Sequence, residues 1–191
     1  MLDGILYKYS AHKSHAKQVM ELSLKIFDEL KTLGFHKMSS KKREFLKIGA
    51  CLHDIGYFVD AKGHNKHSAE LIKQEETLDF KAKDKKFIAC IARYHRGSLP
   101  NGRHGDYNDL SDKKKDKVQK LAGIVRLADG LDRMHLDLVR DVKLSYDPVQ
   151  NILRIEVTPD KSGINLDLSF AQRKKDLLEK AFGVQAVVVC K

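Results

Sequence analysis

The most regular feature of the sequence is a series of segments in which apolar residues recur every three or four positions. This spacing places the apolar side chains on one face of a helix, which can then pack against other helices. It predicts helices over about residues 11–33, 41–56, 64–72, 84–96 and 111–135. Gly34 is expected to close the first helix, and Ser40 is expected to cap the second.

The pattern changes after residue 138. Short runs rich in β-branched residues predict strands at 142–146, 152–157 and 184–189, with a helix from about 168 to 182 before the last strand. We therefore expect a mainly α protein. A helical bundle should occupy residues 1–138, and a small α+β (ββαβ) C-terminal subdomain should occupy residues 139–191.

Composition narrows the classes of partner. The formal net charge of +10 favours polyanions such as polyphosphate or phosphorylated small molecules. Aromatic residues make up only 7% of the chain and Trp is absent, so specific nucleic-acid binding is not expected. The three cysteines lack CxxC spacing and should be reduced core residues. Neither a signal peptide nor a membrane-spanning run is evident, which predicts a cytoplasmic protein that does not contact membranes.

Histidines and aspartates interrupt the apolar faces of the predicted helices. A single inward histidine is most often a hydrogen-bonded core residue, but a buried carboxylate needs a cation or several donors. Imidazole and carboxylate groups that converge from several helices are typical of a metal centre inside a bundle. The residues on these inward faces are His15, His53, Asp54, His64, His67, His95 and Asp129.

The order of these residues resembles the HD superfamily of metal-dependent phosphohydrolases. The closer resemblance is to the C-terminal HD region of the Ppx/GppA exopolyphosphatase and guanosine pentaphosphate phosphohydrolase family. The stretches that carry it are His15–Val19, Leu52–Gly56, His64–Ser68, Ala92–Arg96 and Arg126–Leu131. The actin-like N-terminal catalytic domain of that family is absent from this sequence, so the resemblance does not by itself imply exopolyphosphatase activity.

The resemblance implies a fold, a cofactor and a set of site residues. The fold is an HD-type helical bundle, and the cofactor is one or two divalent ions, with Mn²⁺, Fe, Ni²⁺ or Zn²⁺ fitting mixed His/Asp ligands better than Mg²⁺. His53 and Asp54 are the implied catalytic residues, and Asp54 would bridge two ions. The first ion would be held by His15, His53, Asp54 and Asp129, and the second by Asp54, His67 and His95, with His64 as the substitute for His67.

Substrate phosphates need fixed cations near these ligands. Arg126 and Arg133 lie three residues before and four residues after Asp129, on roughly the same side of their helix. Arg96 and Lys66 are weaker candidates, because each adjoins a predicted ligand and so projects about 100° away from it. Surface salt bridges are the alternative role for all four cations.

Three functions are compatible with the sequence. The first is an HD-type phosphohydrolase that cleaves a phosphate ester or anhydride of a nucleotide, a guanosine polyphosphate or polyphosphate, by means of metal-activated water. The second is a non-catalytic module that binds polyphosphate or nucleotides. The third is a regulatory partner of a separate phosphatase domain. The full ligand set favours the first function, and a homodimer is the expected oligomeric state.

Overall fold

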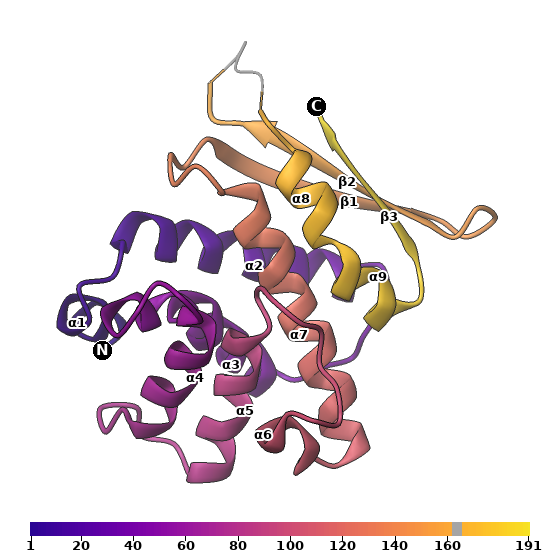
Figure 1. The fold of residues 1–191 in the computed structure, drawn as a ribbon. Helices are drawn as coiled ribbons and strands as arrows, with labels where there is room; N and C mark the ends of the chain where they lie inside the picture. Colours follow the sequence, from indigo (N-terminus) through magenta and orange to yellow (C-terminus); the bar gives the residue numbers. More distant parts are fainter. Residues whose placement is uncertain (162–165) are drawn as a thin grey trace.

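The computed structural model describes residues 1–161 and 166–191, which form a bundle of helices and a small C-terminal sheet (Figure 1). The bundle contains α1 (Leu2–Lys8), α2 (Lys13–Thr32), α3 (Ser40–Cys51), the 3-10 helix η1 (Ile55–Phe58), α4 (His64–Gln74), α5 (Ala82–Arg93), α6 (Gly105–Asn108) and α7 (Asp112–Leu131). The C-terminal part contains β1 (Val139–Asp147), β2 (Ile152–Pro159), α8 (Ser169–Lys174), α9 (Asp176–Phe182) and β3 (Gln185–Cys190). The expected mainly α fold with a small C-terminal α+β part is confirmed.

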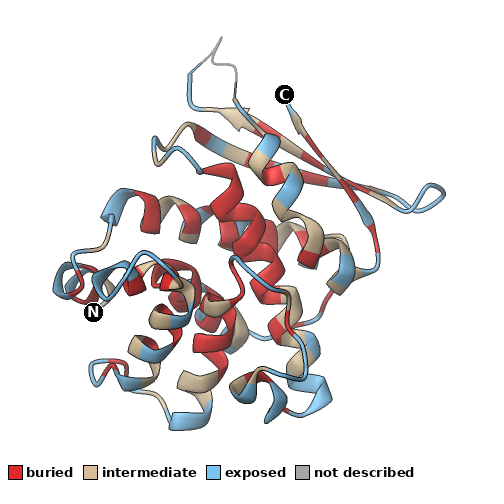
Figure 2. Ribbon diagram, viewed as in Figure 1, coloured by how far each residue is buried: buried red, intermediate tan, exposed pale blue. Residues whose placement is uncertain are grey.

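Helix α7 forms the centre of the core. Every residue from Leu121 to Leu131 is buried, and the ribbon of α7 is correspondingly red in Figure 2. The apolar face predicted for α2 is buried as well, with Val19, Ile26 and Leu30 completely inaccessible to solvent. The periodic residues therefore build the core because each helix turns its apolar face toward α7 or toward a neighbour of α7.

The C-terminal strands form one sheet in the order β1-β2-β3. Strand β2 is central, and it pairs antiparallel with β1 and parallel with β3. Helices α8 and α9 lie between this sheet and α7 (Figure 1). The division of the chain into two domains at residue 138 stays a prediction, but the last two helices pack directly on the central helix of the bundle.

Several element boundaries differ from the predicted ones. Helix α1 and the 3-10 helix η1 were not expected, because they are too short to show a helical period. The predicted helix over 168–182 is interrupted at Lys175 and forms α8 and α9. The short helix α6 was not expected either, and the N-cap of α3 is Ser39 rather than Ser40.

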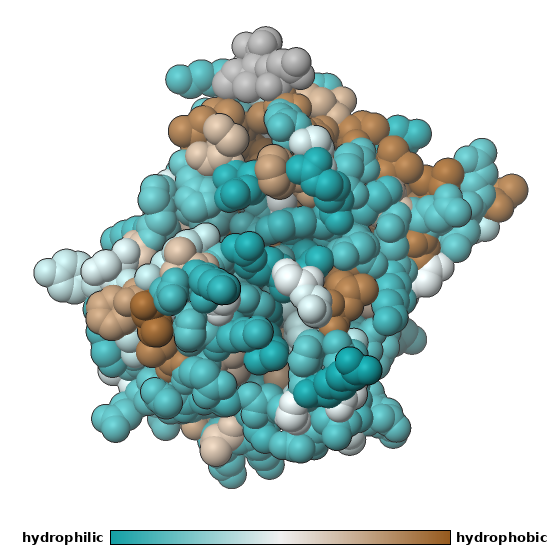
Figure 3. Space-filling model, in the orientation of Figure 1, coloured by the Kyte–Doolittle hydropathy of each residue, from teal (hydrophilic) through white to brown (hydrophobic). Residues whose placement is uncertain are grey.

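None of the described helices has both the length and the hydrophobicity needed to cross a lipid bilayer. The face of the molecule shown in Figure 3 is largely hydrophilic, with small hydrophobic areas between polar ones.

The buried carboxylate of Glu75 ties α1 to the end of α4. It accepts hydrogen bonds from Lys8 Nζ, the Tyr9 hydroxyl and the Thr77 hydroxyl, each at 2.8 Å. Burial alone would raise the pKa of Glu75, but the hydrogen bonds from Lys8, Thr77 and Tyr9 lower it to about 2. Since this pKa lies below that of the unfolded chain, the ionised carboxylate stabilises the fold above about pH 4.5, and the contribution disappears as the pH falls toward 2.

We therefore expect Glu75→Gln to lower the free energy of unfolding by about 1.5–3 kcal/mol at neutral pH, the usual contribution of charged hydrogen bonds. Urea titrations between pH 7 and 2 should show the variant losing less stability than the native protein below pH 4.5. Glu70→Gln is the control, because Glu70 is exposed and, among the described residues, forms an ion pair only with Lys73 at the surface. Parallel pH curves for Glu75→Gln and the native protein would contradict this role.

Candidate metal centre

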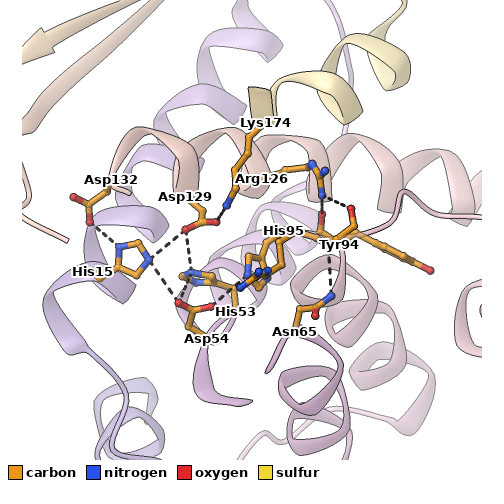
Figure 4. A network of polar contacts seen from close by, with 12 residues as sticks. His15, His53, Asp54, Asn65, Tyr94, His95, Arg126, Asp129, Asp132 and Lys174 are labelled. Atoms are coloured by element: carbon orange, nitrogen blue, oxygen red, sulfur yellow. Dashed lines mark hydrogen bonds and ion pairs between the residues drawn. The ribbon is translucent and has the colours of Figure 1, made fainter. Parts of the chain in front are cut away.

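Five of the predicted ligands come from different parts of the bundle and meet at one place (Figure 4): they are His15, His53, Asp54, His95 and Asp129. His15 lies in the first turn of α2, and Asp129 lies near the end of α7. His53 and Asp54 form the turn that follows α3, rather than its last helical turn as predicted. His95 likewise lies just beyond the end of α5. Helix ends deliver these side chains to the centre because the helical interiors are occupied by the apolar core.

The turn after His53 and Asp54 depends on a close approach between two chain segments. The backbone N–H of Gly56 donates a hydrogen bond to Ser68 Oγ at 2.8 Å, which joins η1 to α4. A Cβ atom at residue 56 would overlap the backbone oxygen of His64. Only glycine therefore allows α4 to lie against this turn, and this contact brings the start of α4 beside Asp54.

Each imidazole in the centre is held through its Nδ1 atom. Nδ1 of His53 lies 2.7 Å from the Ala50 carbonyl oxygen, and Nδ1 of His95 lies 2.7 Å from that of Ala92. Nδ1 of His64 lies 3.0 Å from the Ala61 carbonyl oxygen. A carbonyl oxygen only accepts hydrogen bonds, so Nδ1 carries a proton in these three rings, and the neutral form of each ring has its lone pair on Nε2, which faces the centre.

The Nε2 atoms surround Asp54 and Asp129. His64 Nε2 and His95 Nε2 lie 3.2 and 3.3 Å from Asp54 Oδ1. His53 Nε2 lies 3.5 Å from Asp54 Oδ2 and 3.9 Å from Asp129 Oδ1. Within the part of the chain that the structure describes, His53 Nε2 and Asp54 Oδ1 are buried and have no hydrogen-bond partner.

In the contact between His95 Nε2 and Asp54 Oδ1, both atoms are hydrogen-bond acceptors. Burial and the neighbouring His53 lower the pKa of His95 to about 3, so its ring is neutral. The proton of that ring is directed to Ala92, and the remaining lone pair on Nε2 faces a carboxylate oxygen. Two acceptors at 3.3 Å repel each other unless a cation lies beside both, so these residues fit a divalent metal ion.

His15 differs from the other imidazoles of the centre because its Nδ1 faces a carboxylate and not a backbone carbonyl. Its Nδ1 lies 2.7 Å from Asp132 Oδ2, and its Nε2 lies 3.4 Å from Asp129 Oδ1 and 3.8 Å from Asp54 Oδ2. Burial lowers the pKa of His15, but hydrogen bonds to Asp129 and Asp132 outweigh this effect and raise it to about 9. A carboxylate behind a histidine ligand orients the ring and increases its basicity, which is typical of metal sites. The ring of His135 stacks on that of His15 with 3.7 Å between ring centroids.

The structure brings together His15, His53, Asp54, His95 and Asp129, but His64 rather than His67 completes the group around Asp54. His67 is half-buried and belongs to none of the described clusters of potential ligands. His64 is the first residue of α4 and is almost completely buried.

A cavity of about 240 Å³ opens beside this centre and is lined by both ligands and cations. Of the four cations predicted to bind substrate phosphate, Arg96, Arg126 and Arg133 line the cavity, whereas Lys66 is exposed and does not. Arg126 is already engaged, because its guanidinium donates to both Asp176 oxygens at 2.7 and 3.0 Å and to the Gly97 carbonyl oxygen at 3.0 Å. Arg126 therefore stabilises the wall of the cavity by joining α7 to Asp176 and Gly97. Among the described residues, Arg133 has fewer such contacts than Arg126 and is better placed to contact a substrate.

Sequence reasoning missed two charged residues of the site. Asp132 lies one helical turn after Asp129, a spacing that could have marked it as a partner for a ligand. Lys174 from α8 donates a hydrogen bond to Asp129 Oδ2, as Figure 4 shows. No local pattern in the sequence indicates that α8 reaches the site.

Comparison with known proteins gives one family match, to the model described as Ppx/GppA phosphatase, domain III, over residues 2–175. A guanosine-5'-triphosphate,3'-diphosphate pyrophosphatase from Pseudoalteromonas translucida is 28% identical over 127 residues, which cover 66% of this chain and 24% of that protein. A protein of the same name from Aeromonas hydrophila is 25% identical over 89 residues, covering 47% of this chain and 18% of that protein.

The chain therefore spans about a quarter or less of the length of these curated relatives. The family match, in contrast, includes every residue of the candidate metal centre and the cation Lys174. Since it covers most of the sequence, the chain belongs to the Ppx/GppA phosphatase domain III family.

Proposed function

We propose that this protein is a metal-dependent phosphohydrolase of the HD type, which hydrolyses a phosphate ester or anhydride. The observation that carries this proposal is the acceptor-to-acceptor arrangement at the centre, where neutral His95 Nε2 faces Asp54 Oδ1 at 3.3 Å. A structural core would not place unpartnered acceptors against one another, because each buried acceptor without a donor costs about 1–3 kcal/mol.

The ligand groups suggest two adjoining ions that share Asp54. Asp54 Oδ2 faces His15 and His53, and its Oδ1 faces His64 and His95. One ion would be held by His15, His53, Asp54 and Asp129, and the other by Asp54, His64 and His95. Ions bound there would lower the pKa of water and neutralise the oxygens of a phosphoryl group. The mixed His/Asp set favours Mn²⁺, Fe, Ni²⁺ or Zn²⁺.

The chain's own residues would bind and orient the substrate. Arg133 and Arg96 line the cavity beside the ligands and can donate to phosphoryl oxygens. The printed names of the two relatives describe a pyrophosphatase of a guanosine polyphosphate. Guanosine polyphosphates, nucleotides and polyphosphate are therefore the substrate classes that we propose.

A second candidate function follows from how little of the relatives the chain spans. The aligned regions cover only 24% and 18% of those proteins, so most of each relative, and with it the activity in its name, can lie outside the aligned region. The chain would then be a polyphosphate- or nucleotide-binding module, or a regulatory partner of a phosphatase domain. Such a module needs the cations of the cavity but not the unpartnered imidazoles.

Metal analysis followed by a substrate screen tests the proposal. The purified protein should retain about one or two equivalents of a transition metal, and phosphate or pyrophosphate release should depend on added Mn²⁺. The screen should include guanosine polyphosphates, nucleotides, cyclic nucleotides and polyphosphate. Binding of these compounds without release from any of them would reject the hydrolase in favour of the module.

A further inference from the structure

We propose that Lys174, from the C-terminal helix α8, is a phosphate-binding residue of this site and completes it. The inference rests on the proposed function, since it concerns how the same centre holds its substrate. No sequence pattern assigns Lys174 such a role, and it lies 45 residues beyond Asp129.

The Lys174 side chain lies between the cavity and the ligand carboxylate of Asp129. It is mostly buried, lines the cavity and donates to Asp129 Oδ2, while Asp129 Oδ1 faces His15 and His53. One oxygen of this carboxylate thus faces the ligand cluster and the other faces the lysine. A phosphoryl group in the cavity would meet the lysine amine on the side opposite the imidazoles.

The packing of α8 fixes this position. The Cα of Gly130 lies so close to α8 that a Cβ there would come within 2.9 Å of Ala171 Cα. On its other side, α8 is tied to the sheet, because Gln172 Nε2 donates to the Val188 carbonyl oxygen at 2.6 Å. The ion pair between Arg126 and Asp176 holds the start of α9 against the same helix α7. A backbone fixed on both sides delivers the lysine to one place, as a preorganised cation requires.

The same face of α8 also positions a second cation, the guanidinium of Arg133. Phe170 lies one helical turn before Lys174, and both line the cavity. The guanidinium of Arg133 lies 5.2 Å from the centroid of the Phe170 ring. Among the described residues, no carboxylate lies within ion-pair distance of Arg133, so its charge remains available to an anion. Helix α8 therefore supplies one cation and supports another.

The charge of Lys174 has opposite consequences for a metal ion and for a phosphate. A lysine on a ligand carboxylate repels a divalent cation, whereas it attracts a phosphoryl oxygen. Removal of the charge should therefore strengthen metal binding and weaken phosphate binding. A residue that only stabilised the fold would not change the two affinities in opposite directions.

The test uses Lys174→Met and Lys174→Arg in the full chain. Titration calorimetry with Mn²⁺ should show about threefold to tenfold tighter binding to Lys174→Met than to the native protein. Inorganic phosphate should bind the Mn²⁺-loaded variant about tenfold more weakly, and turnover of any substrate cleaved by the native protein should fall about 100-fold. Lys174→Arg should restore much of both losses. Lys180→Met is the control, because Lys180 is exposed on α9 and does not line the cavity.

The outcomes separate this inference from the proposed function. Weaker phosphate binding with tighter Mn²⁺ binding, in a native protein without turnover, would support the role of Lys174 and reject the hydrolase. Native turnover that Lys174→Met leaves unchanged would overturn the role of Lys174 alone. Loss of both affinities in Lys174→Met would show a structural residue, and a native protein that binds no phosphate would also overturn the inference.

Discussion

An Asp54→Asn variant should release phosphate at least about 10³-fold more slowly than the native protein under Mn²⁺-saturating conditions, the loss expected when a bridging ligand of a two-ion site is removed. Asp54 is the residue around which the centre is arranged, since its two oxygens face different pairs of imidazoles. An amide carries no charge, and its nitrogen directs two N–H donors toward the ring lone pairs. It would therefore be a poor replacement for the carboxylate that we propose to be shared by two ions.

The same substitution should leave the metal-free fold intact or make it more stable. Burial raises the pKa of Asp54, but the neighbouring imidazoles, His53 first, outweigh this effect and lower the pKa, so the carboxylate is ionised although it is largely removed from water. A neutral amide can donate to imidazole acceptors that otherwise have no partner, such as His53 Nε2. Thermal denaturation in the presence of a chelator should show a Tm equal to or above that of the native protein.

Asp60→Asn is the matched control, because Asp60 is an exposed loop residue whose carboxylate accepts a hydrogen bond only from the Lys62 backbone among the described residues. It should retain activity and metal content. Turnover by Asp54→Asn within a few-fold of the native rate would show that phosphate release does not require this centre, even if the protein binds metal.

The sequence predicts the bundle well because a helix that packs against α7 needs apolar residues every three or four positions, and this spacing is visible in the sequence. Residues such as Val19 and Ile26 are apolar at helical spacing, and the structure buries them fully. The inward positions of His15 and Asp129 follow from the same period, since each continues an apolar face. The elements α1 and η1 are too short to show a repeated apolar spacing, so the sequence did not predict them.

Contacts between distant segments are the part of the site that sequence patterns do not encode. Lys174 reaches Asp129 only because α8 packs closely on α7 at Gly130, and a single glycine in a helix does not indicate which segment packs against it. His53 and Asp54 were assigned to the last turn of a helix, whereas α3 ends at Cys51 and they lie in the turn that follows. His53 and Asp54 were predicted as ligands from their inward positions and from the family resemblance, but their backbone conformation depends on the contact between Gly56 and α4.

Sequence patterns also could not decide between His64 and His67 as a ligand, because the decision depends on a contact between separate segments. Substitution of these two histidines should have very different effects on phosphate release. Both lie near the start of α4, and the helical period relates both to Leu71. Only His64 reaches the centre, because it is the first residue of the helix and η1 packs beside it: the Tyr57 ring stacks on the imidazole at 3.8 Å between centroids. Its Nε2 then lies 3.2 Å from Asp54 Oδ1, while His67 belongs to no described ligand cluster.

We therefore expect His64→Gln to lower Mn²⁺-dependent phosphate release by about 100-fold, at the upper end of the effect of a weakened metal site, and His67→Gln to change it less than about twofold. Metal analysis should show the reason: His64→Gln should lose the ion proposed at Asp54, His64 and His95 and keep the one proposed at His15, His53, Asp54 and Asp129. The two variants make the same chemical change three residues apart on one helix, so a general effect of losing an imidazole from α4 would appear in both. Equal losses would mean that α4 only supports the fold, and a larger loss in His67→Gln would mean that the active arrangement brings the other histidine to Asp54.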